Sequence, residues 1–131
     1  MAHKIYTKAV LDKLGVKPDS KVAVLGVSDG AFLERLQART PNVSLGRLRK
    51  DLDLIFYEAN SQAELAKLAR LKGSLKPDGA IWVVSLKGKA ARVKDVDVIA
   101  AAIEAGLVDT KVVGFSETHT SLKLVIPVAK R

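Results

Sequence analysis

The apolar residues of this sequence gather in short runs that predict the strands of a sheet. The first run, Val22 to Leu25, contains no polar residue, which is typical of a central parallel strand covered on both faces. In the last run, every second residue from Leu122 to Val128 is apolar and Lys123 points the other way. Strands are therefore expected at about residues 21–26, 52–57, 80–85, 111–116 and 122–128.

Apolar residues at helical spacing lie between these runs. Tyr6, Val10 and Leu14 recur at every fourth position, and Gly15 supplies a helix stop. Asp29 is an N-cap candidate for the next helix. Ser61 and Glu64 form the pattern of a capping box at the start of a third. The helices are expected at about residues 4–14, 30–39, 61–72 and 96–105, the last with an apolar face made of Val96, Ile99, Ala100 and Ile103.

The order of these elements predicts the fold. Strands that alternate with helices indicate a parallel sheet with right-handed crossovers. Ser116 to Ser121 is too short for a crossover helix, so the last two strands are expected to pair as an antiparallel hairpin. Val43 to Leu45 is a candidate edge strand, and Lys76 to Gly79 a candidate turn. We expect one α/β domain over residues 1–131, with three layers and a mostly parallel, Rossmann-like sheet closed by a C-terminal antiparallel hairpin.

Composition narrows the class of protein. The chain has 131 residues, is 48% hydrophobic and contains no cysteine, so it can build a core but no disulfide, thiolate nucleophile or cysteine-ligated metal site. No apolar run approaches the ~20 residues of a membrane span, and residues 1–8 lack the apolar segment of a signal peptide. A soluble cytoplasmic protein without a metal site or a membrane partner is expected, and its oligomeric state is left open.

The net charge of +8 suggests anionic partners. An anionic small molecule is one candidate, and RNA or another polyanion is a second, which the basic loops at residues 46–50 and 87–94 would serve. Aromatic residues make up only 5% of the chain, which disfavours a stacking platform for single strands. Nucleic-acid binding is therefore the less favoured of the two.

The carboxyl ends of the predicted strands are the expected place for a ligand. The glycine turn after the first strand offers backbone donors at a helix N-terminus. Glu58 and Asn60 follow the next strand, and Ser85 is the last residue of the third. We expect a ligand-binding rim made of Gly26, Ser28, Asp29, Gly30, Lys87, Glu117 and His119. Glu117 and His119 together would provide a pair for acid–base chemistry.

Several segments resemble the class I methyltransferases. Val22–Gly30 is similar to their first cofactor motif, Asp51–Tyr57 to the strand before their substrate loop, and Leu75–Val83 to their proline–glycine turn and fifth strand. Over nearly the whole chain, the sequence resembles a bacterial family of short uncharacterised domains with a reduced methyltransferase-like fold. That likeness rests on Leu14–Pro18, Leu25–Gly26, Lys76–Val83, Ala105–Val112, Glu117–Thr118 and Leu122–Lys123. Where that family usually carries a tryptophan in the hairpin, this chain has His119.

The chain departs from the methyltransferase pattern at the cofactor motif. Val24 stands where the motif has an acid, Ser28 replaces the middle glycine, and no acid follows Val43–Leu45 to hold a ribose. Only 22 residues separate Gly30 from Asp53, too few for a further βαβ crossover, which needs ~30 residues. The resemblance with these departures predicts no cofactor, no tight S-adenosylmethionine binding, and a non-catalytic ligand-binding or interaction module. The alternatives are a methyltransferase with degraded motifs, an acid–base catalyst using Glu117 and His119, and a basic RNA-binding accessory protein.

Overall fold

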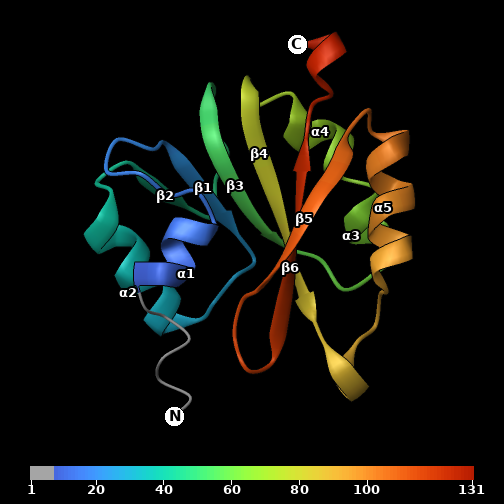
Figure 1. The fold of residues 1–131 in the computed structure, drawn as a ribbon, viewed down its shortest axis with the longest axis horizontal. Coiled ribbons are helices and arrows are strands. Elements are labelled where there is room, and N and C mark those ends of the chain that lie inside the picture. Colours follow the sequence, from blue (N-terminus) through green and yellow to red (C-terminus); the bar gives the residue numbers. More distant parts are fainter. Residues whose placement is uncertain (1–7) are drawn as a thin grey trace.

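The strands form one mixed sheet. The computed structural model describes residues 8–131, in which six strands lie in the order β2-β1-β3-β4-β6-β5 (Figure 1). The parallel pairs are β2–β1, β1–β3 and β3–β4, whereas β6 is antiparallel to both β4 and β5. This confirms the predicted α/β fold and its C-terminal hairpin. The strands are β1 (Val22–Leu25), β2 (Val43–Leu45), β3 (Leu52–Glu58), β4 (Leu75–Leu86), β5 (Val108–Gly114) and β6 (His119–Val125).

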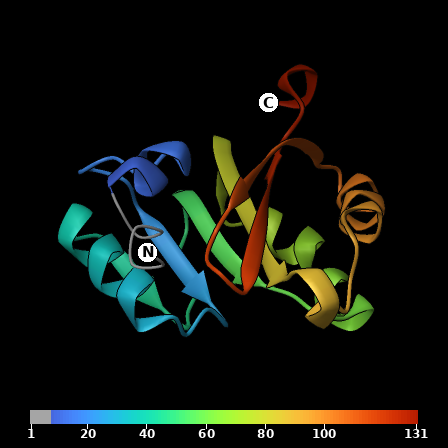
Figure 2. The same ribbon diagram turned by 60° about the horizontal axis from the view of Figure 1, so that its bottom comes forward.

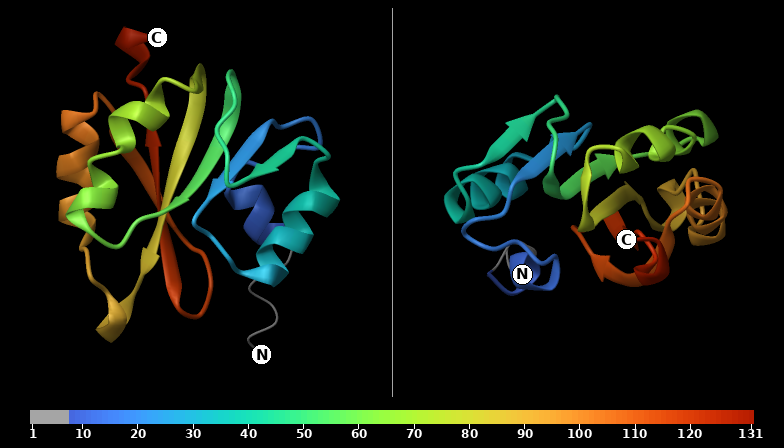
Figure 3. Two further views of the ribbon diagram at one scale, coloured as in Figure 1. Left: turned by 180° about the vertical axis from the view of Figure 1, so that it is seen from behind. Right: turned by 90° about the horizontal axis from the view of Figure 1, so that it is seen from above.

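Helices cover both faces of the sheet, which gives the three predicted layers (Figures 1, 2 and 3). On one face, Phe32 and Leu36 of α2 pack with Val22 and Val24 in one apolar cluster. On the other face, the buried residues of α3, α4 and α5 pack with Ala23 and the neighbouring strands in a second cluster. The helices are α1 (Lys8–Lys13), α2 (Gly30–Arg39), α3 (Gln62–Leu65), α4 (Leu68–Lys72) and α5 (Asp95–Glu104), with short 3-10 turns η2 (Gly88–Ala90) and η3 (Val128–Lys130).

Trp82 lies at the centre of the α1/α2 side of the sheet. Its side chain is fully buried, and its Nε1 donates a hydrogen bond of 2.9 Å to the carbonyl oxygen of Leu14. Because a buried indole N–H needs an acceptor, this bond fixes the segment after α1 against β4. The predicted helix at residues 4–14 is described only from Lys8, and Tyr6 lies outside the described residues. Gly15 ends it with φ of 79°, as expected of a glycine stop.

The hairpin strands begin three residues earlier than predicted, and they end two residues earlier in β5 and three in β6. Ser116 is the cause, because its Oγ accepts hydrogen bonds from the backbone N–H groups of Thr118 and His119 and tightens the turn. β6 therefore starts at His119 and ends at Val125. Val128, which the alternation assigned to the strand, lies in η3 and is 78% exposed.

Two other predicted elements differ in detail. The expected turn at Lys76–Gly79 is a bulge inside β4, since Leu52 pairs with Leu75 and Leu54 with Ala80. Gly79 is required there, because a Cβ would lie 2.8 Å from the carbonyl oxygen of Leu52. The expected helix at residues 61–72 is broken into α3 and α4.

The apolar face predicted for α5 is wrong in part. Val98 and Ala102 are buried against the sheet and Ile99 packs against the same cluster, whereas Val96 and Ile103 are 67% and 66% exposed. The helix carries apolar residues on two sides, and Val96 and Ile103 lie on the outer one. Among the described residues, no helix is long and apolar enough to cross a membrane.

Candidate functional site at the carboxyl ends of the strands

The turn after β1 brings open backbone to the carboxyl edge of the sheet. Gly26 has φ of 79°, a conformation that side chains rarely adopt, and a Cβ on it would lie 3.5 Å from the carbonyl oxygen of Glu58. Ser28 is exposed, and Gly30 is the first residue of α2. Asp29 is the N-cap of α2, because its Oδ1 accepts from the Phe32 N–H at 3.2 Å. Gly26, Ser28 and Gly30 thus line the edge, while Asp29 holds the helix start.

Glu58 joins the end of β3 to the hairpin. Its Oε2 lies 3.0 Å from His119 Nε2 and also accepts from Asn60 Nδ2 at 3.0 Å. The two side chains of the Glu58–His119 pair are about one-fifth exposed, so solvent reaches them from the edge. Asn60 is held in turn by its own Oδ1, which accepts from the Leu86 N–H. The ends of β3, β4 and β6 therefore meet at one carboxylate.

Thr118 completes a chain of polar contacts through the imidazole. Its Oγ1 lies 2.7 Å from His119 Nδ1. Because an ionised carboxylate only accepts hydrogen bonds, Nε2 carries a proton toward Glu58, and a neutral ring then accepts the Thr118 hydroxyl proton at Nδ1. An imidazole held by a carboxylate on one nitrogen can take up a proton on the other, which is the arrangement of an oriented acid–base group.

Two other residues of the predicted rim, Glu117 and Lys87, have exposed side chains. Glu117 is exposed and makes no hydrogen bond to any residue in the range 8–131, so the expected Glu117–His119 pair is wrong. The partner of His119 is Glu58, because the turn puts Glu117 at its outer tip. The side chain of Lys87 is exposed, while its N–H donates to the Thr118 carbonyl oxygen at 3.0 Å and so docks the hairpin onto the end of β4.

A groove adjoins the rim on the face of α4. It has a volume of about 560 Å³ and begins beside Leu25 and Tyr57, the residues that precede Gly26 and Glu58. Its walls are mixed, since leucines and Tyr57 lie beside Lys67 and Arg70, which are its only charged lining residues within the described part of the chain. This volume is in the usual range for small-molecule sites. The remaining lining residues are Gly46, Leu48 and Leu71.

Sequence reasoning missed Thr118 and the groove. Thr118 follows Glu117 in an exposed turn, and nothing in the residue pattern indicates that its hydroxyl meets the imidazole. One feature of the sequence could have indicated the groove, namely the short connection from β2 to β3. Only residues 46–51 join the two strands, so no helix crosses the face beside β1.

No protein-family model matches the sequence, and no curated protein matches it. Solved structures do match its fold. A SAM-dependent methyltransferase from Aquifex aeolicus superposes with a TM-score of 0.70 at 15% identity, over 95% of this chain and 93% of its own. CalO1, a methyltransferase of calicheamicin biosynthesis in its SAH-bound form, gives 0.68 at 14%, over 95% and 54%. Aeropyrum pernix fibrillarin with natively bound S-adenosyl-L-methionine gives 0.62 at 13%, over 84% and 68%.

These matches correct the expectation that the fold carries no cofactor. The fibrillarin structure holds S-adenosyl-L-methionine and the CalO1 structure holds SAH. Val24 and Ser28 do not exclude a cofactor, because backbone N–H groups at a helix N-terminus also bind anionic ligands. The chain spans about half the length of CalO1 and nearly all of the Aquifex protein. It has a class I methyltransferase-like fold.

Proposed function

We propose that this chain binds an S-adenosyl compound at the carboxyl ends of β1 and β3. The observation that carries the proposal is the adjacency of the open turn at Gly26, the carboxylate of Glu58 and the groove beside Leu25. The fold supports it, since structures of the same fold hold S-adenosyl-L-methionine or SAH. Val24 offers no acid, and Glu58 is the carboxylate that adjoins both the turn at Gly26 and the hairpin at His119.

The residues present suit the parts of such a ligand. The apolar walls at Leu48 and Leu71 would take the adenine ring, and Lys67 or Arg70 would favour a carboxylate. Glu58 Oε2 is used by Asn60 and His119, but Oε1 has no hydrogen-bond partner in the described part of the chain and can accept from ribose hydroxyls. When bound, S-adenosylmethionine supplies an electrophilic methyl group. His119 would hold its proton at Nε2 and accept another at Nδ1.

Calorimetric titration with SAH tests the proposal. The wild-type chain is expected to bind SAH, and Glu58→Gln is expected to weaken binding by roughly ten- to a hundredfold, because one charge-assisted hydrogen bond contributes ~1.5–3 kcal/mol. Glu117→Gln is the matched control. It makes the same change on an exposed carboxylate of the same edge, and should leave the affinity unchanged.

Thermal unfolding of the three proteins verifies that they remain folded, and a bound ligand should also raise the unfolding temperature. Absence of SAH binding at millimolar concentration would contradict the proposal. So would equal affinities of the wild type and Glu58→Gln.

A further inference from the structure

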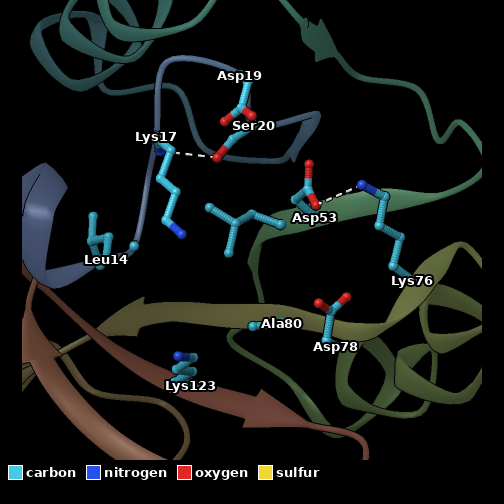
Figure 4. A pocket seen from close by; sticks show the side chains of 11 residues that line it. Leu14, Lys17, Asp19, Ser20, Asp53, Lys76, Asp78, Ala80 and Lys123 are labelled. Carbon is cyan, nitrogen blue, oxygen red and sulfur yellow. Dashed lines mark hydrogen bonds and ion pairs between the residues drawn. The ribbon is translucent and has the colours of Figure 1, made fainter. Parts of the chain in front are cut away.

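A second cavity lies at the opposite end of the sheet, where the parallel strands begin. Its volume is about 420 Å³, and it is lined by the segment after α1, the first residues of β3 and β4, and β6 (Figure 4). Leu14, Leu54 and Ala80 give it an apolar floor. Its charged lining residues are Lys17, Asp19, Asp53, Lys76, Asp78 and Lys123.

Asp53 and Lys76 satisfy each other and take little part in binding. Lys76 Nζ donates to Asp53 Oδ1 at 2.9 Å, and Asp53 Oδ2 accepts from the Lys21 N–H at 2.8 Å. Both carboxylate oxygens of Asp53 are therefore occupied. The charges that remain for a ligand are two lysines and two aspartates at other positions of the lining.

Lys123 presents an ammonium group with no counter-ion in the described part of the chain. It is half-buried on β6, and none of the ion pairs within residues 8–131 includes it. Burial lowers the pKa of Lys123, and the nearby charges of Lys111 and Arg131 lower it further. An anion placed here would relieve the burial cost of that charge and the repulsion from its neighbours.

The opposite charge lies across the cavity. Figure 4 shows Lys17 and Lys123 on one side, while Asp78 projects from β4 on the other. Asp78 and Asp19 form no ion pair with any residue in the range 8–131. The cavity therefore has two ammonium groups on one side, with Asp19 on the same segment as Lys17, and the Asp78 carboxylate on the other side near the Asp53–Lys76 pair.

We propose that this cavity binds a small zwitterion of the α-amino-acid type, with its carboxylate toward Lys123 and Lys17 and its ammonium toward Asp78. Leu14 and Leu54 would contact an aliphatic side chain. A simple anion would leave Asp78 with only the nearby charge of Lys76, which is already paired with Asp53, and a simple cation would leave Lys123 without a counter-ion. The proposal does not depend on the S-adenosyl site, which lies at the other ends of the strands.

A matched set of three compounds with one carbon skeleton tests the charge requirement. L-leucine carries both charges, leucine methyl ester only the ammonium, and N-acetyl-leucine only the carboxylate. In amide NMR spectra of the full chain, L-leucine is expected to shift the signals of Lys17, Asp19, Ser20 and Ala80 in a concentration-dependent way. Each analogue is expected to bind at least about tenfold more weakly, since it loses one charge-assisted contact.

Variants test whether Lys123 binds the carboxylate of leucine and Asp78 its ammonium group. Lys123→Met and Asp78→Asn are each expected to lower leucine affinity about tenfold or more. Lys89→Met and Asp95→Asn make the same changes on exposed residues outside the cavity and should leave the affinity unchanged. Three results would overturn the proposal: no shifts up to 10 mM leucine, N-acetyl-leucine binding as tightly as leucine, or control variants that weaken binding equally. Unfolding temperatures show that each variant is folded.

Discussion

Asp53 connects three segments through its carboxylate. It accepts from the backbone before β1 and from Lys76 at the start of β4, while it lies on β3 itself. Burial alone would raise the pKa of Asp53, but the Lys21 N–H and the charge of Lys76 outweigh it and hold the pKa below its usual value of 3.8. The ionised form is therefore favoured in the folded state.

This pKa shift predicts a loss of stability in acid. A carboxyl whose pKa is lowered by folding contributes stability that is fully present above pH 3.8 and disappears as the pH falls through the folded-state pKa. Asp53→Asn should cost about 1 kcal/mol of unfolding free energy at neutral pH, a modest value because the pair is 39% and 31% exposed. The difference from the wild type should vanish in strong acid.

Chemical denaturation at several pH values measures this difference. Asp19→Asn is the control, since Asp19 is exposed and forms no ion pair within the described residues. If the wild type and Asp53→Asn lost stability in parallel from neutral pH to pH 2, the carboxylate would not carry the effect.

Hydrogen bonds between residues close in the sequence were predictable, whereas contacts between residues far apart in the sequence were not. Asp29 and Ser61 cap helices because the N–H groups that they satisfy lie three residues away, at Phe32 and Glu64. Glu58 and His119 are 61 positions apart, and only the folded sheet brings them together. The sequence alone indicated Glu117, the nearest carboxylate along the chain, as the partner of His119, and this was wrong.

At the scale of elements, the two apolar sides of α5 are expected to contribute differently to the free energy of unfolding. Val98 is buried and Val96 is 67% exposed, although both are valines of the same helix. Val98→Ala is expected to cost about 1.5–2.5 kcal/mol, since it removes two methyl groups from the core and leaves a small cavity. Val96→Ala should stay within about 0.5 kcal/mol.

Urea unfolding of the two variants measures these costs. The comparison is internally controlled because the substitution, the helix and the helix propensity change are the same. Equal losses in both variants would mean that the outer side of α5 is as tightly packed as the inner side, against the structure.

The order and direction of the strands were predicted better than the residues at which each strand begins and ends. Parallel order follows from alternation with helices, and β1, β3 and β4 run as expected. The hairpin ends depend on the Ser116 hydroxyl, and the bulge in β4 depends on the pairing with Leu52. Both are interactions between segments, so an apolar run by itself does not set the limits.

At the scale of the whole molecule, two loops that leave from the carboxyl edge of the sheet carry exposed basic residues. The loop after β2 runs back to the amino edge, where the parallel strand β3 begins, and the loop after β4 leads to α5. They contribute to the net charge of +8. The residues are Arg47, Arg49, Lys50, Lys87, Lys89, Arg92 and Lys94.

Retention on heparin tests whether these loops form an anion-binding surface. The wild type is expected to bind heparin at low salt and to elute at moderate salt, because exposed charges are screened. Replacing all seven residues with glutamine should move elution to lower salt. Unchanged elution would mean that this charge is only solvated surface.

The single tryptophan of the chain makes the molecule its own optical probe. Trp82 pairs with Lys123 across β4 and β6, whereas His119 pairs with Leu86 at the end of β4. Since its indole bonds to Leu14, which lines the cavity at the amino ends of the strands, its emission reports how that segment is seated. A change of tryptophan emission on adding a compound therefore reports a change around Trp82 and the segment after α1, without any label having to be attached.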